Sequence, residues 1–191
     1  MILEGLITTT GEDGLAHAAP MGAVVPESPP EAWTGLTLRP YPSTATLANL
    51  RRTGSAVFHV TDDVEMIARA AVSQLPPPSV TRAEGVDGWI LAGACRWYAL
   101  RATRIDDSAD RAEVLAEIVG QGRLRDFFGL NRAKHAVVEA AILATRVRFL
   151  PHDEIRAAMT RLAPLVEKTG GAAERRAFAF LSQYIDRECP R

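Results

Sequence analysis

The chain has 191 residues, enough for one sizeable hydrophobic core or for one core with a small appended module. Of these residues 47% are hydrophobic and 24% are charged, as in an ordinary globular domain. The net charge of −1 argues against a nucleic-acid or membrane-surface protein, because either would carry a basic excess. No apolar stretch reaches about 18 residues, so no membrane span is predicted.

The cysteines Cys95 and Cys189 are too few for a disulfide framework and too widely spaced for a zinc site. They are predicted to be free thiols in a reducing compartment, and no metal site is expected. Glu4 interrupts the first apolar run, and no basic segment precedes that run, so the N-terminus does not resemble a signal peptide. These features predict a cytoplasmic protein.

The first two thirds of the sequence read as strands and turns. A Gly-Glu-Asp-Gly turn separates the first two strands, and residues 55–61 alternate with period two. The predicted strands cover residues 2–9, 15–25, 34–39 and 55–61, with one or two more within 89–105. Residues 111–121 fit a strand or a helix equally well, short helices are predicted at 43–54 and 62–72, and 76–88 read as a loop.

From about Asn131 the pattern changes to three helices. Pro151 ends the first helix, and Pro164 is expected to kink the second. The first helix gathers small residues on one face, which suit close packing: Ala133, Ala136, Val137, Ala140, Ala141 and Ala144. The sequence therefore predicts an α+β, mainly β fold, with a β-rich domain over 1–125 and a helical subdomain over 126–191.

Residues 38–50 form the most informative local stretch: a strand, a proline corner, a hydroxyl cluster and a helix. A helix N-terminus presents free N–H groups and partial positive charge, and Ser43, Thr44 and Thr46 add hydroxyl donors that suit a phosphate. The terminus contributes only about 0.3–1 kcal/mol toward an anion, whereas micromolar binding needs about 8 kcal/mol. An arginine, with Arg39 nearest, and a large apolar ring must supply the rest. A simple helix cap with neighbouring threonines explains the same pattern, and both interpretations stay open.

Two other polar segments also have two interpretations. Residues 127–135 join two aromatics to a helix start that carries Arg132, Lys134 and His135, which suits an anion or a partner chain. A solvated first turn capped by Asn131 fits equally well. Asp62 and Asp63 favour a helix cap over a metal pair, because adjacent side chains point apart. Hydrolase, kinase and zinc-enzyme motifs do not occur.

Taken in order, several segments resemble one family, the proteins called domain of unknown function 447. The matching segments are residues 1–6, 19–22, 38–50, 57–63 and 127–146. Each segment alone is weak evidence, but the ordered set extends over most of the chain.

This resemblance implies an FMN-binding split β-barrel of six or more strands, related to flavin-reductase-like barrels, with FMN at the interface of a homodimer. It implies that Ser43, Thr44 and Thr46 hold the phosphate with Arg39, and that the strand at Met21 and Gly22 lies along the isoalloxazine. The implied cofactor-binding residues are Met21, Gly22, Arg39, Tyr41, Ser43, Thr44, Thr46, Asn49, Thr61, Asn131, Arg132 and His135. Apart from the resemblance, His59 lies on the more polar face of its strand, where an exposed or hydrogen-bonded histidine is the default role and a flavin contact is the alternative. Relatives often carry a basic residue where this chain has Pro42 and Ala45, which leaves Arg39 and Arg132 as the charges for the phosphate.

The resemblance favours a flavin-dependent oxidoreductase, in which FMN carries the redox chemistry and the protein orients it. The electron donor and acceptor are expected to be small molecules. The family's association with pterin-linked one-carbon metabolism suggests a pterin-type acceptor. A non-catalytic flavin carrier, sensor or assembly module needs the same cradle, so the sequence leaves both functions open and assigns no catalytic acid or base.

Overall fold

The computed structural model describes residues 1–189, which form two compact units. The barrel unit contains Met1–Thr61 and Pro76–Phe127, and the helical unit contains Asp62–Leu75 and the chain from Phe128 onward. Helices occupy 37% of the chain and strands 30%, and the predicted combination of a barrel with a helical part is confirmed. None of the helices within residues 1–189 is long and apolar enough to cross a membrane.

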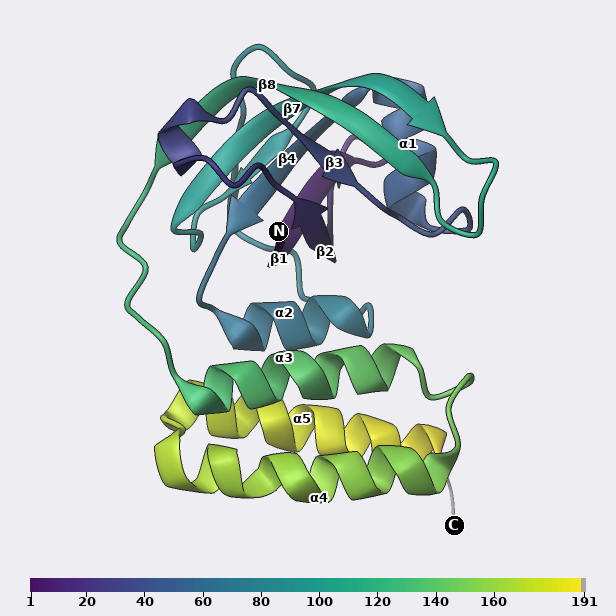
Figure 1. Cartoon of the computed structure of the whole chain (residues 1–191), viewed down its shortest axis with the longest axis vertical. Coiled ribbons are helices and arrows are strands. Elements are labelled where there is room, and N and C mark those ends of the chain that lie inside the picture. Colours follow the sequence, from purple (N-terminus) through teal and green to yellow (C-terminus); the bar gives the residue numbers. More distant parts are fainter. Residues whose placement is uncertain (190–191) are drawn as a thin grey trace. The chain divides into compact units, whose positions relative to one another are not determined.

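The barrel unit is a closed antiparallel barrel (Figure 1). Its strands are β1 (Ile2–Thr10), β2 (Ala16–Val24), β3 (Gly35–Leu38), β4 (Ser55–Val60), β7 (Arg96–Asp106) and β8 (Glu113–Arg123). They pair in the order β1-β2-β3-β8-β7-β4, and β4 closes the barrel on β1. The ambiguous residues 111–121 are therefore largely strand, because β8 fills the gap between β3 and β7.

The period-two pattern of residues 55–61 divides β4 between two cores. Ala56 and Phe58 face the barrel interior with Ile7, Leu38 and Leu100. Residues on the opposite face are covered by a separate hairpin of β5 (Val80–Arg82) and β6 (Trp89–Leu91), where the sequence predicted a loop up to residue 88.

A short helix, α1 (Ala45–Thr53), closes one end of the barrel. Its Leu47 and Leu50 belong to the barrel core, and Asn49 Nδ2 donates to Thr9 Oγ1 at 3.0 Å. The helix ends at Gly54, whose φ of 64° is the left-handed conformation that glycine adopts most easily. A 3-10 turn, η1 (Pro30–Ala32), lies between β2 and β3.

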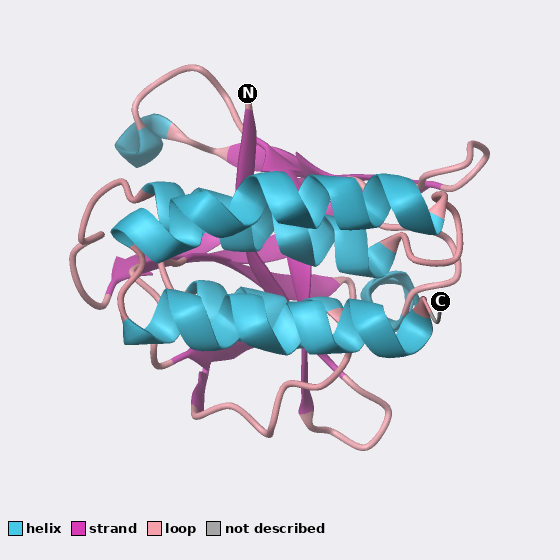
Figure 2. Cartoon of the chain, turned by 90° about the horizontal axis from the view of Figure 1, so that it is seen from below, coloured by secondary structure: helices cyan, strands magenta, loops and turns pink. Residues whose placement is uncertain are grey.

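The helical unit contains α2 (Val64–Ala71), α3 (Arg132–Thr145), α4 (His152–Thr169) and α5 (Ala172–Glu188) (Figure 2). The small-residue face of α3 is buried against the other helices of this unit, together with Val64, Leu181 and Ile185. Pro164 lies inside α4, which continues through it. The predicted division at residue 125 placed α2 with the barrel, whereas in the structure α2 packs on α3 and α5.

Candidate functional site

The corner between β3 and α1 is built around Thr44. Its backbone N–H donates to the Tyr41 carbonyl at 3.1 Å, and its hydroxyl donates to the same carbonyl at 2.8 Å. The hydroxyl also accepts the Leu47 N–H at 3.3 Å, so Thr44 is the N-cap of α1. The sequence left two interpretations of Thr44 open, a phosphate ligand and a helix cap. The structure shows the cap, and the Thr44 hydroxyl is already used in it.

The other hydroxyl residues of the corner differ in exposure. Thr46 is 2% exposed and faces the barrel side of α1, as does Asn49 through its bond to Thr9. Ser43 is exposed immediately before the cap. The first turn of α1 thus presents Ser43 and backbone N–H groups to an anion, while Thr46 and Asn49 hold the helix against the barrel.

Two arginines lie at the same corner. The Arg39 guanidinium is 3.4 Å from the Glu113 carboxylate, and both side chains are about half exposed. Arg111 donates to the Tyr41 hydroxyl at 2.6 Å and stacks 4.2 Å from the ring centroid. Arg111 was not among the predicted site residues, because it lies 70 positions from Tyr41 and reaches it only through the pairing of β8 with β3.

An open cavity of about 500 Å³ adjoins these arginines. It is lined by Arg39, Asp106, Ser108, Ala109, Asp110, Arg111 and Glu113. Exposed ion pairs contribute about 0–1 kcal/mol, so the pair with Glu113 does not prevent Arg39 from turning to a stronger anion.

The strand predicted to lie along a flavin presents its two residues to opposite sides. Met21 is 8% exposed and belongs to the barrel core, so its side chain points inward. Gly22 lies on the outer face, opposite Glu4, where an added Cβ would come within 2.9 Å of Ile2 Cγ2. A ring on this face of the strand would therefore meet the Ile2 and Glu4 side chains, which lie over Gly22, rather than the Met21 side chain. Thr61 is also buried, at 7% exposed.

The remaining predicted residues belong to the helical unit. Asn131 caps α3 by accepting the Ala133 N–H at 2.7 Å, and its Nδ2 donates to the Thr169 carbonyl at 3.0 Å. Arg132 and His135 are exposed on the first turn of α3. The prediction of an Asn131 cap is confirmed.

Asp62 and Asp63 have structural partners within the helical unit. Asp63 caps α2 through the Met66 N–H at 2.9 Å, as the sequence favoured. Asp62 is 7% exposed; its carboxylate accepts the Phe128 N–H at 3.1 Å, and its carbonyl accepts from Lys134 Nζ at 2.7 Å. Within residues 1–189 no group of three or more His, Cys, Asp or Glu side chains could hold a metal ion.

His59 is fully buried on the outer face of β4, beneath β6. Its Nδ1 lies 3.3 Å from the Leu6 carbonyl, and its Nε2 accepts the Leu91 N–H at 3.1 Å. Burial lowers the pKa of His59 to about 4, so the ring is neutral near pH 7. A flavin contact, one of the two roles left open for His59, does not fit a side chain with no exposed surface.

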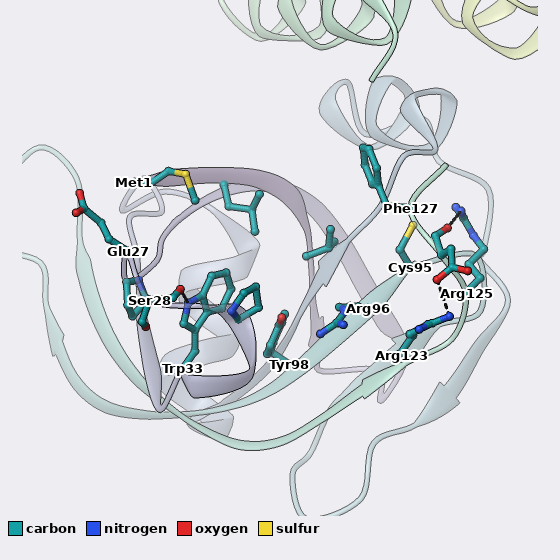
Figure 3. Close-up of a pocket in the computed structure, with 15 residues that line it drawn as sticks. Met1, Glu27, Ser28, Trp33, Cys95, Arg96, Tyr98, Arg123, Arg125 and Phe127 are labelled. Carbon is teal, nitrogen blue, oxygen red and sulfur yellow. Dashed lines mark hydrogen bonds and ion pairs between the residues drawn. The ribbon is translucent and has the colours of Figure 1, made fainter. Parts of the chain in front are cut away.

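A second cavity, of about 440 Å³, lies at the mouth of the barrel (Figure 3). Trp33, Tyr98 and Arg96 line one wall, and Met1 and Phe127 lie across from them. The sequence analysis identified none of these residues as site residues. They come from four separate parts of the chain, and only the closure of the barrel brings them together.

Two family models match the chain. Residues 3–125 match the N-terminal domain of the protein of unknown function family DUF447, and residues 131–183 match a second model of the same family. The chain belongs to the DUF447 family. A search of curated proteins gave no match.

Several solved structures have folds similar to that of this DUF447 chain. An FMN-bound DUF447 protein from Methanosarcina mazei matches with a TM-score of 0.81 and 21% identity, over 96% of this chain and 94% of its own. The flavin reductase HpaC, complexed with NADP+, matches with a TM-score of 0.55 and 13% identity, over 66% and 81%. Flavoredoxin from Methanosarcina acetivorans matches with a TM-score of 0.52 and 13% identity, over 64% and 68%. At these identities the likeness establishes the fold.

Proposed function

We propose that this DUF447 chain binds FMN and acts as a flavin-dependent oxidoreductase. The observation that carries the proposal is the match to an FMN-bound member of the same family over nearly the full length of both chains. The likeness to a flavin reductase complexed with NADP+ supports a nicotinamide as the electron donor. A pterin-type acceptor is part of the proposal, on the family association alone.

The β3–α1 corner fits the phosphate of FMN in its chemistry. Ser43 offers an exposed hydroxyl, the first turn of α1 offers backbone N–H groups, and Arg39 and Arg111 offer charge-assisted donors. Thr44 orders the turn that positions these groups, because its hydroxyl joins the Tyr41 carbonyl to the start of the helix. Arg39 and Arg111 would hold the phosphate, and Thr44 and Thr46 would support it without donating to it.

The outer face of β2 near Gly22 offers a flavin the apolar side chain of Ile2. Ile2 Cγ2 lies 2.9 Å and Glu4 Oε1 3.3 Å from where a Cβ of Gly22 would stand, so these two side chains cover the Gly22 backbone. Ile2 is 61% exposed, so a flat ring would pack against it. When bound, FMN would supply the redox chemistry, while these residues orient the ring and exclude water from one of its faces.

The first test is the colour of the purified full chain and the mass of the cofactor it releases. We expect a yellow protein that releases FMN. Under anaerobic conditions NADH or NADPH should then bleach the flavin absorbance, and a pterin-type acceptor should restore it. A yellow protein that neither nicotinamide reduces would contradict the proposed nicotinamide-linked activity and support a carrier or sensor.

We also propose that the chain is a homodimer. The small-residue face of α3, which the sequence suggested as the contact, is buried within its own helical unit and so is unavailable. Exposed apolar side chains gather instead at Phe128 and Leu130, which are 93% and 99% exposed. Large apolar side chains so exposed at neighbouring positions favour burial against another chain.

Light scattering should give twice the 20.7 kDa chain mass for the wild type. Replacing Phe128 and Leu130 together with Ser should shift the mass toward one chain, because the contact would lose most of its apolar area. Leu15→Ser, at a side chain that is 64% exposed elsewhere, is the matched control and should stay dimeric. A wild-type monomer that binds FMN would contradict the homodimer, and a dimeric double variant would place its interface elsewhere.

A further inference from the structure

The barrel-mouth cavity lies far from the corner proposed for the FMN phosphate. Strand β1 starts at the cavity, which Leu3 lines, and runs to Thr9 and Thr10, where Asn49 and Arg52 of α1 bind. Six residues separate Leu3 from Thr9, which is about 20 Å at roughly 3.3 Å per residue. The cavity and the second half of α1 are therefore at opposite ends of β1. Trp33 lines the cavity, and Arg39 follows it by six residues, just beyond β3, which again separates the cavity from the corner by about 20 Å of strand.

The apolar wall of this cavity is aromatic and fixed in place. The rings of Trp33 and Tyr98 are 5.5 Å apart at an interplanar angle of 35°, and the two residues are 5% and 1% exposed. Trp33 Nε1 donates to the Ser28 carbonyl at 2.8 Å, which fixes the orientation of the indole. Because these two rings are almost fully buried, they form the floor beneath the cavity, and the apolar surface open to a ligand comes from Met1, Leu3, Val60 and Phe127.

Arg96 supplies the positive charge at this wall. It lies two residues before Tyr98 on β7, so both side chains share one face of the strand (Figure 3). Burial raises the pKa of the Tyr98 phenol, and the hydrogen bond from Arg96 opposes that rise. The guanidinium therefore lies against the aromatic wall, within reach of a ligand seated there.

The carboxylate now paired with Arg96 is weakly held. Glu31 lies 3.2 Å from the guanidinium, and its side chain is 67% exposed. Such an exposed pair contributes about 0–1 kcal/mol. The other lining arginines have nearer partners: Arg123 is 2.5 Å from Asp126, and Arg125 donates to the Gly93 carbonyl at 2.9 Å. The Arg123 and Asp126 side chains are 59% and 78% exposed, whereas Arg96 is 37% exposed. A carboxylate on Arg96 would therefore be less screened by water than one on Arg123.

We propose that this cavity binds a planar aromatic carboxylate, with its ring against Leu3, Val60 and Phe127 above the buried rings of Trp33 and Tyr98, and its carboxylate replacing Glu31 on Arg96. A volume of about 440 Å³ accommodates a two-ring molecule. The lining combines apolar side chains with the charged groups of Glu27, Arg96, Arg123, Arg125 and Asp126. Small-molecule sites likewise set a few polar or charged groups among apolar walls. Arginine matches a carboxylate through two parallel N–H donors, which fixes the orientation of the ligand as well as its charge.

Calorimetry on the full chain with 2-naphthoate tests the site near neutral pH. Naphthoate should bind at least tenfold more tightly than the neutral 2-naphthamide, because the amide cannot form the charge-assisted pair. Arg96→Gln should weaken naphthoate by about tenfold or more, whereas Glu31→Gln should tighten it by up to about fivefold, since the competing carboxylate is removed. Arg101→Gln on the same strand is the control. It breaks an exposed pair with Glu117 outside the cavity and should leave naphthoate affinity unchanged.

Arg96→Gln and Glu31→Gln are expected to change naphthoate affinity in opposite directions. A general loss of stability would weaken binding in both variants, so the test does not depend on folding. Equal affinity for naphthoate and naphthamide, or the same change in both variants, would overturn the proposal. So would octanoate binding as tightly as naphthoate, since the site would then lack a preference for a flat ring. Saturating FMN should leave naphthoate affinity unchanged, and competition between them would refute the separate site. Failure of FMN to bind would remove the proposed function without affecting this result.

Discussion

Replacing Arg39 with Gln and Ser43 with Ala together should weaken FMN binding by at least a hundredfold. Each lost hydrogen bond to the charged phosphate costs about 1.5–3 kcal/mol, and about 1.4 kcal/mol is a factor of ten in affinity. Riboflavin lacks the phosphate, so the double variant should bind it nearly as tightly as the wild type does. Fluorescence titration with both flavins measures this contrast.

The contrast between the two flavins separates a phosphate site from a loss of stability, which would weaken both. Thr44 and Thr46 are poorer probes, because removing the Thr44 cap costs about 1 kcal/mol of helix stability and Thr46 is buried. Thr53→Val removes a hydroxyl bond to the Asn49 carbonyl at the other end of α1 and is the matched control. If the double variant binds FMN like the wild type, the corner is a helix cap and the phosphate assignment is wrong.

How far the barrel could be predicted depended on the length of each strand. The six residues from Ser55 to Val60 are long enough for period-two alternation to appear, and their two faces do enter different cores. Strands β5 and β6 have three residues each, which is too short for a period to be recognised beside the neighbouring prolines. Residues 111–121 fitted two patterns locally, and only pairing with β3 and β7 selects the strand.

The placement of α2 depended on contacts that the sequence does not show. Its own pattern predicts a helix near residues 62–72, and Asp63 begins it as expected. Val64 and Ala68, however, pack with Val137 and Leu181, more than 60 positions later. A boundary drawn where the composition changes, which is also where the two family models divide, therefore keeps this helix with the strands beside it in sequence, although it packs on α3 and α5.

Among the candidate site residues, residue type was easier to predict than orientation. The hydroxyl cluster at residues 43–46 does lie at a helix start, but the phase of α1 turns Thr46 inward and leaves Ser43 outside. Met21 and Gly22 are adjacent, so the alternation of a strand sends them to opposite faces. Arg111 reaches Tyr41 only through strand pairing, and no local spacing could reveal that contact.

His59 gives the barrel unit a pH-dependent stability. In the unfolded chain this ring titrates near its ordinary value of 6.5, but in the folded barrel burial lowers its pKa to about 4. The hydrogen bond to the Leu6 carbonyl opposes this shift, and desolvation outweighs it. The neutral ring also accepts the Leu91 N–H, and protonation would replace that acceptor with a second donor.

Acidification from about pH 7.5 to about pH 5 should therefore lower the free energy of unfolding by about 2 kcal/mol through His59 alone. Because the folded pKa is depressed, the stabilisation is fully present above the unfolded value of 6.5 and is lost as the pH falls toward about 4. Over the whole interval the loss approaches about 3 kcal/mol, at about 1.36 kcal/mol per unit of pKa shift. Urea titrations at several pH values measure this loss of stability.

His59→Gln keeps an acceptor for the Leu91 N–H but does not titrate, so this variant should be less sensitive to pH across the interval. His17→Gln is the control, because His17 is only half-buried and burial alone lowers its pKa; this variant should retain the wild-type dependence on His59. Equal pH dependence in the wild type and His59→Gln would show that the barrel does not hold this ring neutral.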